Sequence, residues 1–110
     1  MSWLVRDDGE VLATLEIAES ARGRARGLLG RDGIEGAILL QPAKAVHTLG
    51  MRFPIDVAHL DGELRVVHLS TMRTGRVGLP RLRARAVIEA EAGTFGGWNL
   101  QVGEQLEIKG

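Results

Sequence analysis

The segment Ile55-Asp56-Val57-Ala58-His59-Leu60-Asp61-Gly62-Glu63-Leu64-Arg65-Val66-Val67-His68-Leu69 carries the clearest structural signal in this chain. Two runs of aliphatic and β-branched residues flank an Asp-Gly dipeptide, which favours a two-residue hairpin turn because both residues tolerate a positive φ. We therefore expect strands at residues 55–60 and 63–69, joined by a tight turn.

A two-residue turn would also fix which residues face one another across the hairpin. It places Ile55 opposite His68, and it makes Asp56 and Arg65 a diagonal pair of opposite charge. The sequence therefore predicts an ion pair on one face of the hairpin.

Short apolar runs separated by glycines continue on both sides of this hairpin. The chain has 15 glycines in 110 residues, which is typical of a β-rich domain with tight turns. Between Val11 and Ile17 apolar residues alternate with more polar ones, which is the period of a half-buried strand. We expect further strands at residues 3–6, 11–17, 37–41, 86–92 and 105–109, and a turn region at residues 94–99.

One helix is expected, at residues 21–29. Ser20 is a suitable N-cap, apolar residues recur at helical spacing, and Gly30 suits the exit from the helix. The length is that of about one domain, and no linker interrupts it, so residues 1–110 are expected to form a single domain. The predicted fold class is mainly β (α+β): a compact antiparallel sheet or a barrel-like domain with one short helix near residues 20–29.

Composition excludes several classes of protein. The absence of cysteine excludes disulfides, thiolate zinc sites and thiol catalysis, and 14 basic residues balance 14 acidic ones, which argues against a generally basic nucleic-acid binder. The longest aliphatic run, Ala37–Leu40, is far shorter than the ~20 residues of a membrane span. The first residues show no basic region followed by an apolar one. We therefore expect a cytoplasmic protein with no membrane partner.

Several motifs, taken in order, resemble those of a known family. They are Arg22-Gly23-Arg24-Ala25-Arg26-Gly27-Leu28-Leu29-Gly30-Arg31, the block from His47 to Asp56, Leu60-Asp61-Gly62, Val87-Ile88-Glu89 before Ala92-Gly93, and Val102-Gly103-Glu104. Together they resemble the domain of unknown function 192 family. The resemblance implies a mainly antiparallel β domain with a short helix, and it implies no reaction because the family has no established one. It also implies that His59 fills a space where the family usually has an aromatic residue.

The first candidate site consists of His47, Arg52 and Asp56, which lie within one short stretch of otherwise apolar sequence. Arg52 could hold a carboxylate or phosphate with its two-pronged guanidinium group, His47 could exchange a proton near neutral pH, and Asp56 would orient one of them. The alternative is a structural network in which Asp56 accepts backbone N–H groups and pairs with an arginine, since buried polar groups need partners with or without a ligand.

The second candidate is Glu89, a single carboxylate within an apolar strand. Burial would raise its pKa and suit it to binding or to acid–base work. The alternative is an ion pair with Arg22 or Arg26 from the predicted helix. Arg26 and Arg65 are secondary candidates for ligand binding.

The sequence gives no reason to expect a metal or a cofactor. His47, His59 and His68 lack the close spacing of zinc ligands, and the glycines near residue 30 do not form a phosphate loop. Five arginines between Arg73 and Arg85 could contact phosphates, but no aromatic residue lies among them to stack on bases. A solvated arginine face is therefore the alternative, and nucleic acid is not the expected partner.

These observations favour a non-catalytic domain that binds a small anionic ligand or a protein partner through a His/Arg/Asp cluster. One alternative is a small hydrolase or isomerase with His47 as general base and Asp56 orienting it, which requires the two side chains to lie within hydrogen-bond reach. A second alternative is an acidic partner or nucleic acid bound by the arginine-rich segment, residues 73–85.

Overall fold

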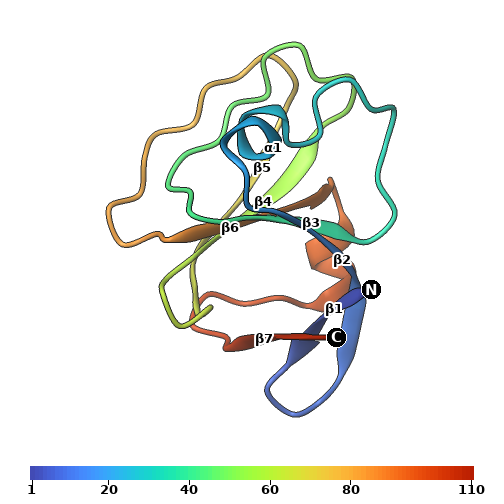
Figure 1. The fold of residues 1–110 in the computed structure, drawn as a ribbon, viewed down its shortest axis with the longest axis vertical. Coiled ribbons are helices and arrows are strands. Elements are labelled where there is room, and N and C mark those ends of the chain that lie inside the picture. The colour runs from blue at the N-terminus through green and yellow to red at the C-terminus, as the bar shows by residue number, and fades with distance from the viewer.

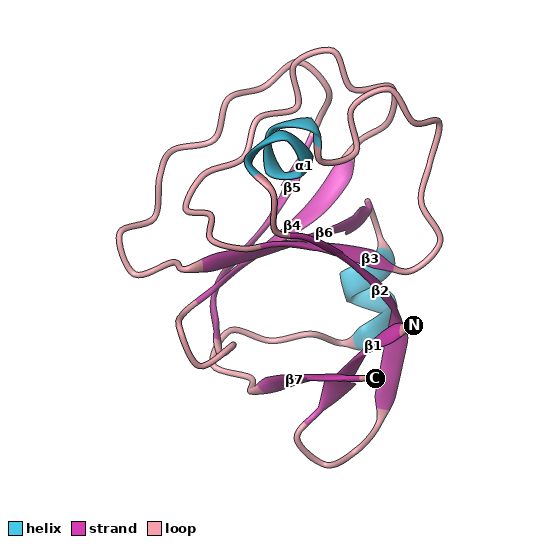
Figure 2. Cartoon of the chain, viewed as in Figure 1, coloured by secondary structure: helices cyan, strands magenta, loops and turns pink.

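A curled sheet of seven strands forms the body of the protein, and the computed structural model describes all 110 residues (Figures 1 and 2). The strands lie in the order β5-β4-β6-β3-β2-β1-β7, and all neighbouring pairs are antiparallel except β2 and β3. The mainly β fold class expected from the sequence is confirmed. The elements are β1 (Ser2–Arg6), β2 (Val11–Ala18), α1 (Ala21–Arg26), β3 (Ala37–Leu40), β4 (Ile55–Leu60), β5 (Val66–Met72), β6 (Ala86–Glu91), α2 (Thr94–Trp98) and β7 (Leu106–Lys109).

The two edges of the sheet meet where the start of β5 lies beside the residues that lead into β7. An isolated bridge pairs Arg65 with Gln105. The Val66 amide donates to the Glu104 carbonyl at 2.9 Å, and the Gly103 amide donates to the Val66 carbonyl at 2.7 Å. The sheet therefore curls into a nearly closed, barrel-like form, joined at this point by a few backbone hydrogen bonds.

Each face of the sheet packs against its own apolar core. The concave face, closed by α2 and the chain that follows it, buries Leu4, Leu15, Ala37, Leu39, Ala58, Leu60, Val66, Ala86, Ile88, Ala90, Phe95, Leu100 and Leu106. The outer face is covered by α1 and the long loops (Figure 1), and it buries Leu28, Ile38, Leu40, Val46, Met51, Ile55, Val57 and Val87. Because successive residues of a strand point to opposite faces, β4 and β6 each contribute to both cores.

The hairpin of β4 and β5 forms, but its predicted register is wrong. Ile55 lies opposite Met72, four residues beyond His68. The Asp61 carboxylate accepts the Glu63 and Arg65 amides at 2.9 and 3.0 Å, so the connection is longer than the predicted two-residue turn. Leu64 has a φ of 66° in this loop, and a bulge follows in the strand pair.

The predicted ion pair between Asp56 and Arg65 does not form, because the register of the hairpin separates the two residues. Asp56 lies opposite Thr71, and Arg65 instead contacts Gln105, with 3.4 Å between Nη2 and Oε1.

The predicted helix is confirmed, although it is shorter than expected. Ser20 caps α1 by accepting the Gly23 amide at 2.9 Å, and the helix ends at Arg26 rather than at residue 29. The turn region expected at residues 94–99 contains a second short helix, α2, from which Phe95 is buried in the concave core beside Trp98. Neither helix is long and apolar enough to cross a membrane.

Candidate functional site

Glu89 lies in the middle of β6 on the outer face of the sheet and is only 4% exposed. No ion pair or hydrogen bond to another side chain offsets the loss of water around it, and burial therefore raises the pKa of its carboxyl to about 7. The alternative of an ion pair with Arg22 or Arg26 is not realised in the structure. Glu89 is thus a buried, unpartnered carboxyl that changes charge near neutral pH.

A cavity of about 360 Å³ opens above Glu89, between the sheet, the C-terminal end of α1 and the loop after β3. Its walls are largely apolar and include Leu28, Leu40, Val46 and Met51. This size and lining are typical of small-molecule sites, in which a few polar groups fix the orientation of the ligand.

Gly27 brings the chain close to Glu89 at the end of α1. Its φ of 48° and ψ of −121° are accessible to glycine but strained for other residues. A Cβ at this position would lie 3.2 Å from Oε1 of Glu89. The glycine therefore keeps one side of the carboxylate open to the cavity.

The remaining polar residues of the cavity are basic. Arg24 and Arg26 come from the last turn of α1, and His47 comes from the loop after β3. The Leu49 amide donates to Nδ1 of His47 at 3.3 Å, which leaves Nε2 to carry the proton of the neutral ring. The cavity therefore joins a carboxyl on its floor to two arginines and a histidine, and the guanidinium group of Arg24 also donates to the Glu19 carbonyl.

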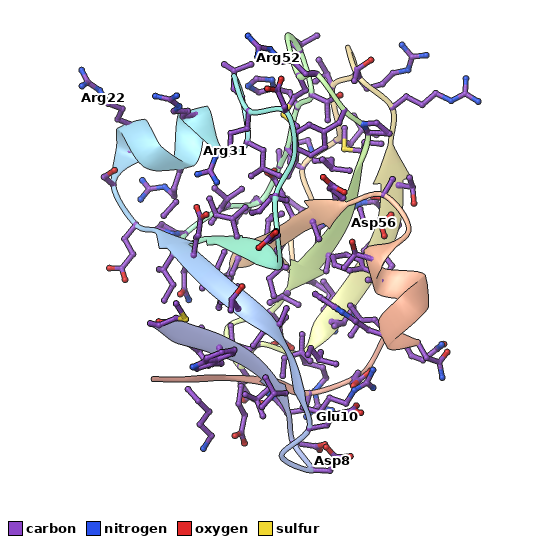
Figure 3. All side chains as sticks on the ribbon, turned by 90° about the vertical axis from the view of Figure 1, so that its right-hand side faces the viewer. Asp8, Glu10, Arg22, Arg31, Arg52 and Asp56 are labelled. Carbon is purple, nitrogen blue, oxygen red and sulfur yellow. The ribbon has the colours of Figure 1, made fainter.

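Asp56 lies on the opposite face of the sheet from this cavity. One oxygen accepts the Thr71 hydroxyl at 2.7 Å, and the other accepts the amides of Gly93 and Phe95 at 2.9 and 3.0 Å. Figure 3 shows the side chain beside α2, whose first turn it caps. The carboxylate thus links β4 to β5 and to the start of α2 through hydrogen bonds. It does not face His47.

Arg52 and Arg65 also lie outside the cavity. Arg52 extends from the loops at the far end of the molecule from β7 (Figure 3) and forms an exposed pair with Asp32, at 2.9 Å between Nη1 and Oδ1. Pairs of this kind contribute about 0–1 kcal/mol. The structure therefore brings together His47, Arg26 and Glu89 of the candidate residues, and it separates Arg52, Asp56 and Arg65 from them.

Two residues of this region were not singled out from the sequence. Arg24 is part of the cavity, but its repeated Arg-x-Arg context gives no signal that distinguishes it from Arg22. Thr48 is fully buried, and its hydroxyl donates to the Arg73 carbonyl at 2.6 Å and accepts the Arg76 amide at 2.9 Å. It thereby attaches the arginine-rich segment to the loop that carries His47.

No three His, Asp or Glu side chains are gathered where they could hold a metal ion. His59 and His68 face each other across β4 and β5 with ring centroids 5.8 Å apart. His59 is buried in the strand pair, as its expected position in an aromatic space implies.

Comparison with known proteins gives relatives along nearly the whole chain. The family DUF192, described as "Uncharacterized ACR, COG1430", matches residues 4–108. A UPF0127 protein of Pyrococcus horikoshii is 33% identical over 98 residues, which cover 84% of this chain and 78% of that protein. A UPF0127 protein of Pyrococcus furiosus is 28% identical over 103 residues, which cover 89% of each.

Two crystal structures share the fold. A protein of unknown function from Novosphingobium aromaticivorans superposes with a TM-score of 0.78 at 19% identity, covering 96% of this chain and 82% of that chain. A protein from Sinorhizobium meliloti, described as a candidate transcription regulator, superposes with a TM-score of 0.79 at 17% identity, covering 96% and 90%. These likenesses concern the fold alone, whereas the sequence match over residues 4–108 establishes that the chain belongs to the DUF192 family.

Proposed function

We propose that the protein is a non-catalytic binding domain whose cavity above Glu89 takes a small molecule carrying both an ammonium and a carboxylate group. The observation that carries this proposal is the buried Glu89 carboxyl, which has no partner within the protein. Burying a carboxylate is unfavourable unless an opposite charge or hydrogen-bond donors reach it, and a ligand ammonium group in the cavity supplies both.

The rest of the cavity supports the same ligand chemistry. Arg26 can hold a carboxylate through charge-assisted hydrogen bonds, which are stronger than neutral ones, and Arg24 adds a second positive charge. The apolar walls accommodate an aliphatic body between the two charged ends. A free amino acid with a branched aliphatic side chain is the simplest molecule with these three features.

Binding fits the geometry better than the hydrolase or isomerase alternative. That alternative needs Asp56 within reach of His47, whereas both oxygens of Asp56 already accept hydrogen bonds on the other face of the sheet. His47 is then a rim residue that contacts the ligand rather than an oriented general base.

The proposal is tested by titrating the ¹⁵N-labelled protein with leucine and following the amide resonances. Two matched compounds, one lacking the amine and one lacking the carboxylate, report on each charged end. Leucine is expected to bind more tightly than either, with shifts confined to the end of α1, residues 46–51 and Glu89. Binding of the amine-free compound as tightly as leucine would contradict the role given to Glu89.

Two variants and one control separate the charged contacts. Glu89→Gln and Arg26→Gln are each expected to weaken leucine binding about tenfold, the loss of one charge-assisted contact of ~1.5 kcal/mol. Arg22→Gln is the matched control because Arg22 projects from the same helix into solvent (Figure 3) and does not line the cavity. Equal weakening by Arg22→Gln would mean that general charge, and not the cavity, attracts the ligand.

Binding is also expected to depend on pH through Glu89. The groups that face it across the cavity are Arg24, Arg26 and His47. Burial holds the pKa of Glu89 at about 7 in the free protein, and an ammonium ligand selects the charged form. Its affinity should therefore fall by about tenfold for each unit of pH below 7, a dependence that Glu89→Gln removes. Calorimetric titration across this range measures it, and an unchanged affinity would count against the ammonium contact.

A further inference from the structure

A second cavity, of about 450 Å³, lies on the same side of the sheet between β5 and residues 73–81. His59 of β4 lines it and is only 5% exposed. Neither Nδ1 nor Nε2 of His59 has a hydrogen-bond partner in the protein. Buried polar atoms are nearly always satisfied, so an imidazole with both nitrogens unpartnered at a cavity wall indicates a ligand that completes it.

Three arginines surround the same cavity. Arg73, Arg76 and Arg81 line it, and none of them takes part in an ion pair, because the five pairs of the protein use Arg6, Arg31, Arg52 and Lys109 as their cations. The side chain of Arg81 contacts the imidazole of His68, with 2.9 Å between Nη2 and Nε2. The cavity thus concentrates positive charge that no carboxylate of the chain offsets.

The arginine-rich segment contains no strand, but its course is fixed. The backbone of Thr48 holds this segment as well as its hydroxyl does. The Thr48 carbonyl accepts the Gly75 amide at 2.8 Å, and the Thr48 amide donates to the Arg76 carbonyl at 2.7 Å. The Gly78 amide donates to the Val46 carbonyl at 2.8 Å. The backbone that carries Arg73 and Arg76 is therefore already positioned, which reduces the loss of entropy when a ligand binds.

We propose that this second cavity binds the phosphate group of a phosphomonoester, held by Arg73, Arg76 and Arg81 and by a hydrogen bond from the His59 ring. Guanidinium groups match the geometry of phosphate oxygens. Val77 and Leu79 are exposed at the cavity rim and contact the carbon skeleton that bears the phosphate. The site differs from the cavity above Glu89, because Val46 is the only lining residue that the two cavities have in common.

The charge state of His59 agrees with this assignment. Burial, together with the nearby His68 and Arg81, lowers the pKa of His59 to about 4, so the ring is neutral and one nitrogen carries a proton to donate. A phosphate dianion in the cavity opposes the effect of the arginines and should raise this pKa. The groups facing His59 are His68 from β5 and Arg73, Arg76 and Arg81 from the segment that follows.

The test follows the ring nitrogens of His59 by NMR while phenyl phosphate is added, with chloride at equal ionic strength as the reference. The expected result is saturable binding that shifts the His59 ring and the amides of residues 70–81 and that raises the pKa of His59. Absence of saturable shifts at these positions, or equal shifts with chloride, would overturn the proposal.

Variants in the arginine-rich segment separate a defined site from general attraction of anions. Arg76→Gln and Arg81→Gln are each expected to weaken phenyl phosphate binding about tenfold. Arg83→Gln is the matched control, being an exposed arginine of the same segment outside the cavity. His59→Phe keeps an aromatic ring in the strand pair and should weaken binding while the protein stays folded. Equal effects of Arg76→Gln and Arg83→Gln would overturn the site.

Further probes distinguish the source of the phosphate. Phenyl phosphate represents a free phosphomonoester, and vesicles containing phosphatidic acid present the same group on a lipid. Binding of either with the His59 response supports the site and identifies its source. A short DNA oligonucleotide that binds without shifting His59, while phenyl phosphate does not bind, would overturn the proposal in favour of a general phosphodiester contact.

Discussion

Asp56→Ala is expected to lower the free energy of unfolding by about 3–5 kcal/mol, although Asp56 is not part of either cavity. The carboxylate is 4% exposed and accepts three hydrogen bonds, one from the Thr71 hydroxyl and two from the amides of Gly93 and Phe95. Its removal leaves the buried Phe95 amide without a partner, at ~1–3 kcal/mol for a group that water does not reach, and it removes two further hydrogen bonds, from Thr71 and Gly93, each worth ~1 kcal/mol. Urea unfolding of the two proteins at the same pH measures the difference.

Two further variants determine whether the hydrogen bonds cause this loss. Asp56→Asn keeps the shape and one acceptor oxygen but turns an NH₂ group toward a donor, so we expect an intermediate loss. Asp32→Ala removes a carboxylate whose pair with Arg52 is exposed, and it should change the free energy by less than ~1 kcal/mol. An Asp56→Ala protein as stable as the Asp32→Ala protein would refute the structural role of Asp56.

The wild-type protein is expected to show nearly constant stability from pH 4.5 to 6.5, because two buried groups have opposite effects there. Burial raises the pKa of Glu89 from 4.5 to about 7, so the folded protein holds a proton that the unfolded chain releases, and stability falls as the pH rises through this range. Burial lowers the pKa of His59 from 6.5 to about 4, so stability rises as the pH rises. Each shift corresponds to about 3 kcal/mol.

Removing one group should reveal the effect of the other. In Glu89→Gln the free energy of unfolding is expected to rise by about 3 kcal/mol between pH 4 and 6.5. His68, whose pKa burial also lowers, contributes in the same direction. In His59→Phe the free energy should fall by about 3 kcal/mol between pH 4.5 and 7.

Urea unfolding of the three proteins at several pH values tests this compensation. Glu35→Gln, a substitution of an exposed glutamate, is the matched control. Parallel pH profiles for the wild type and both variants would mean that neither buried group titrates as the structure implies.

The sequence predicted the strands well because their signals are local. Alternation of apolar residues and glycine-containing turns located β1, β2, β3, β6 and β7 within one or two residues. The register of β4 with β5 depends instead on how the Asp61 side chain organises its own turn. An Asp-Gly dipeptide does not distinguish a two-residue turn from the longer loop with Leu64 at a positive φ.

The candidate site was only partly predictable, for a related reason. His47, Arg52 and Asp56 are close in sequence, but the alternation of β4 sends Asp56 to the concave face, and Arg52 lies in a loop that faces solvent. Glu89 was correctly identified as a polar residue in an apolar strand, since that signal concerns a single position. Its place in the same cavity as Arg24 and Arg26 depends on how α1 lies over β6. No local sequence pattern encodes that packing.

The junction of β5 with β7 has a consequence for how the protein behaves among other copies of itself. An open sheet of this size would present two rows of unpaired backbone groups, which are templates for intermolecular strand pairing and aggregation. Here the Val66, Gly103 and Leu106 amides are engaged in joining the two outermost strands. Loss of these hydrogen bonds would expose the same backbone groups to strand pairing with another copy of the chain. These three amides therefore contribute to the resistance of this domain to aggregation, although none of them belongs to either cavity.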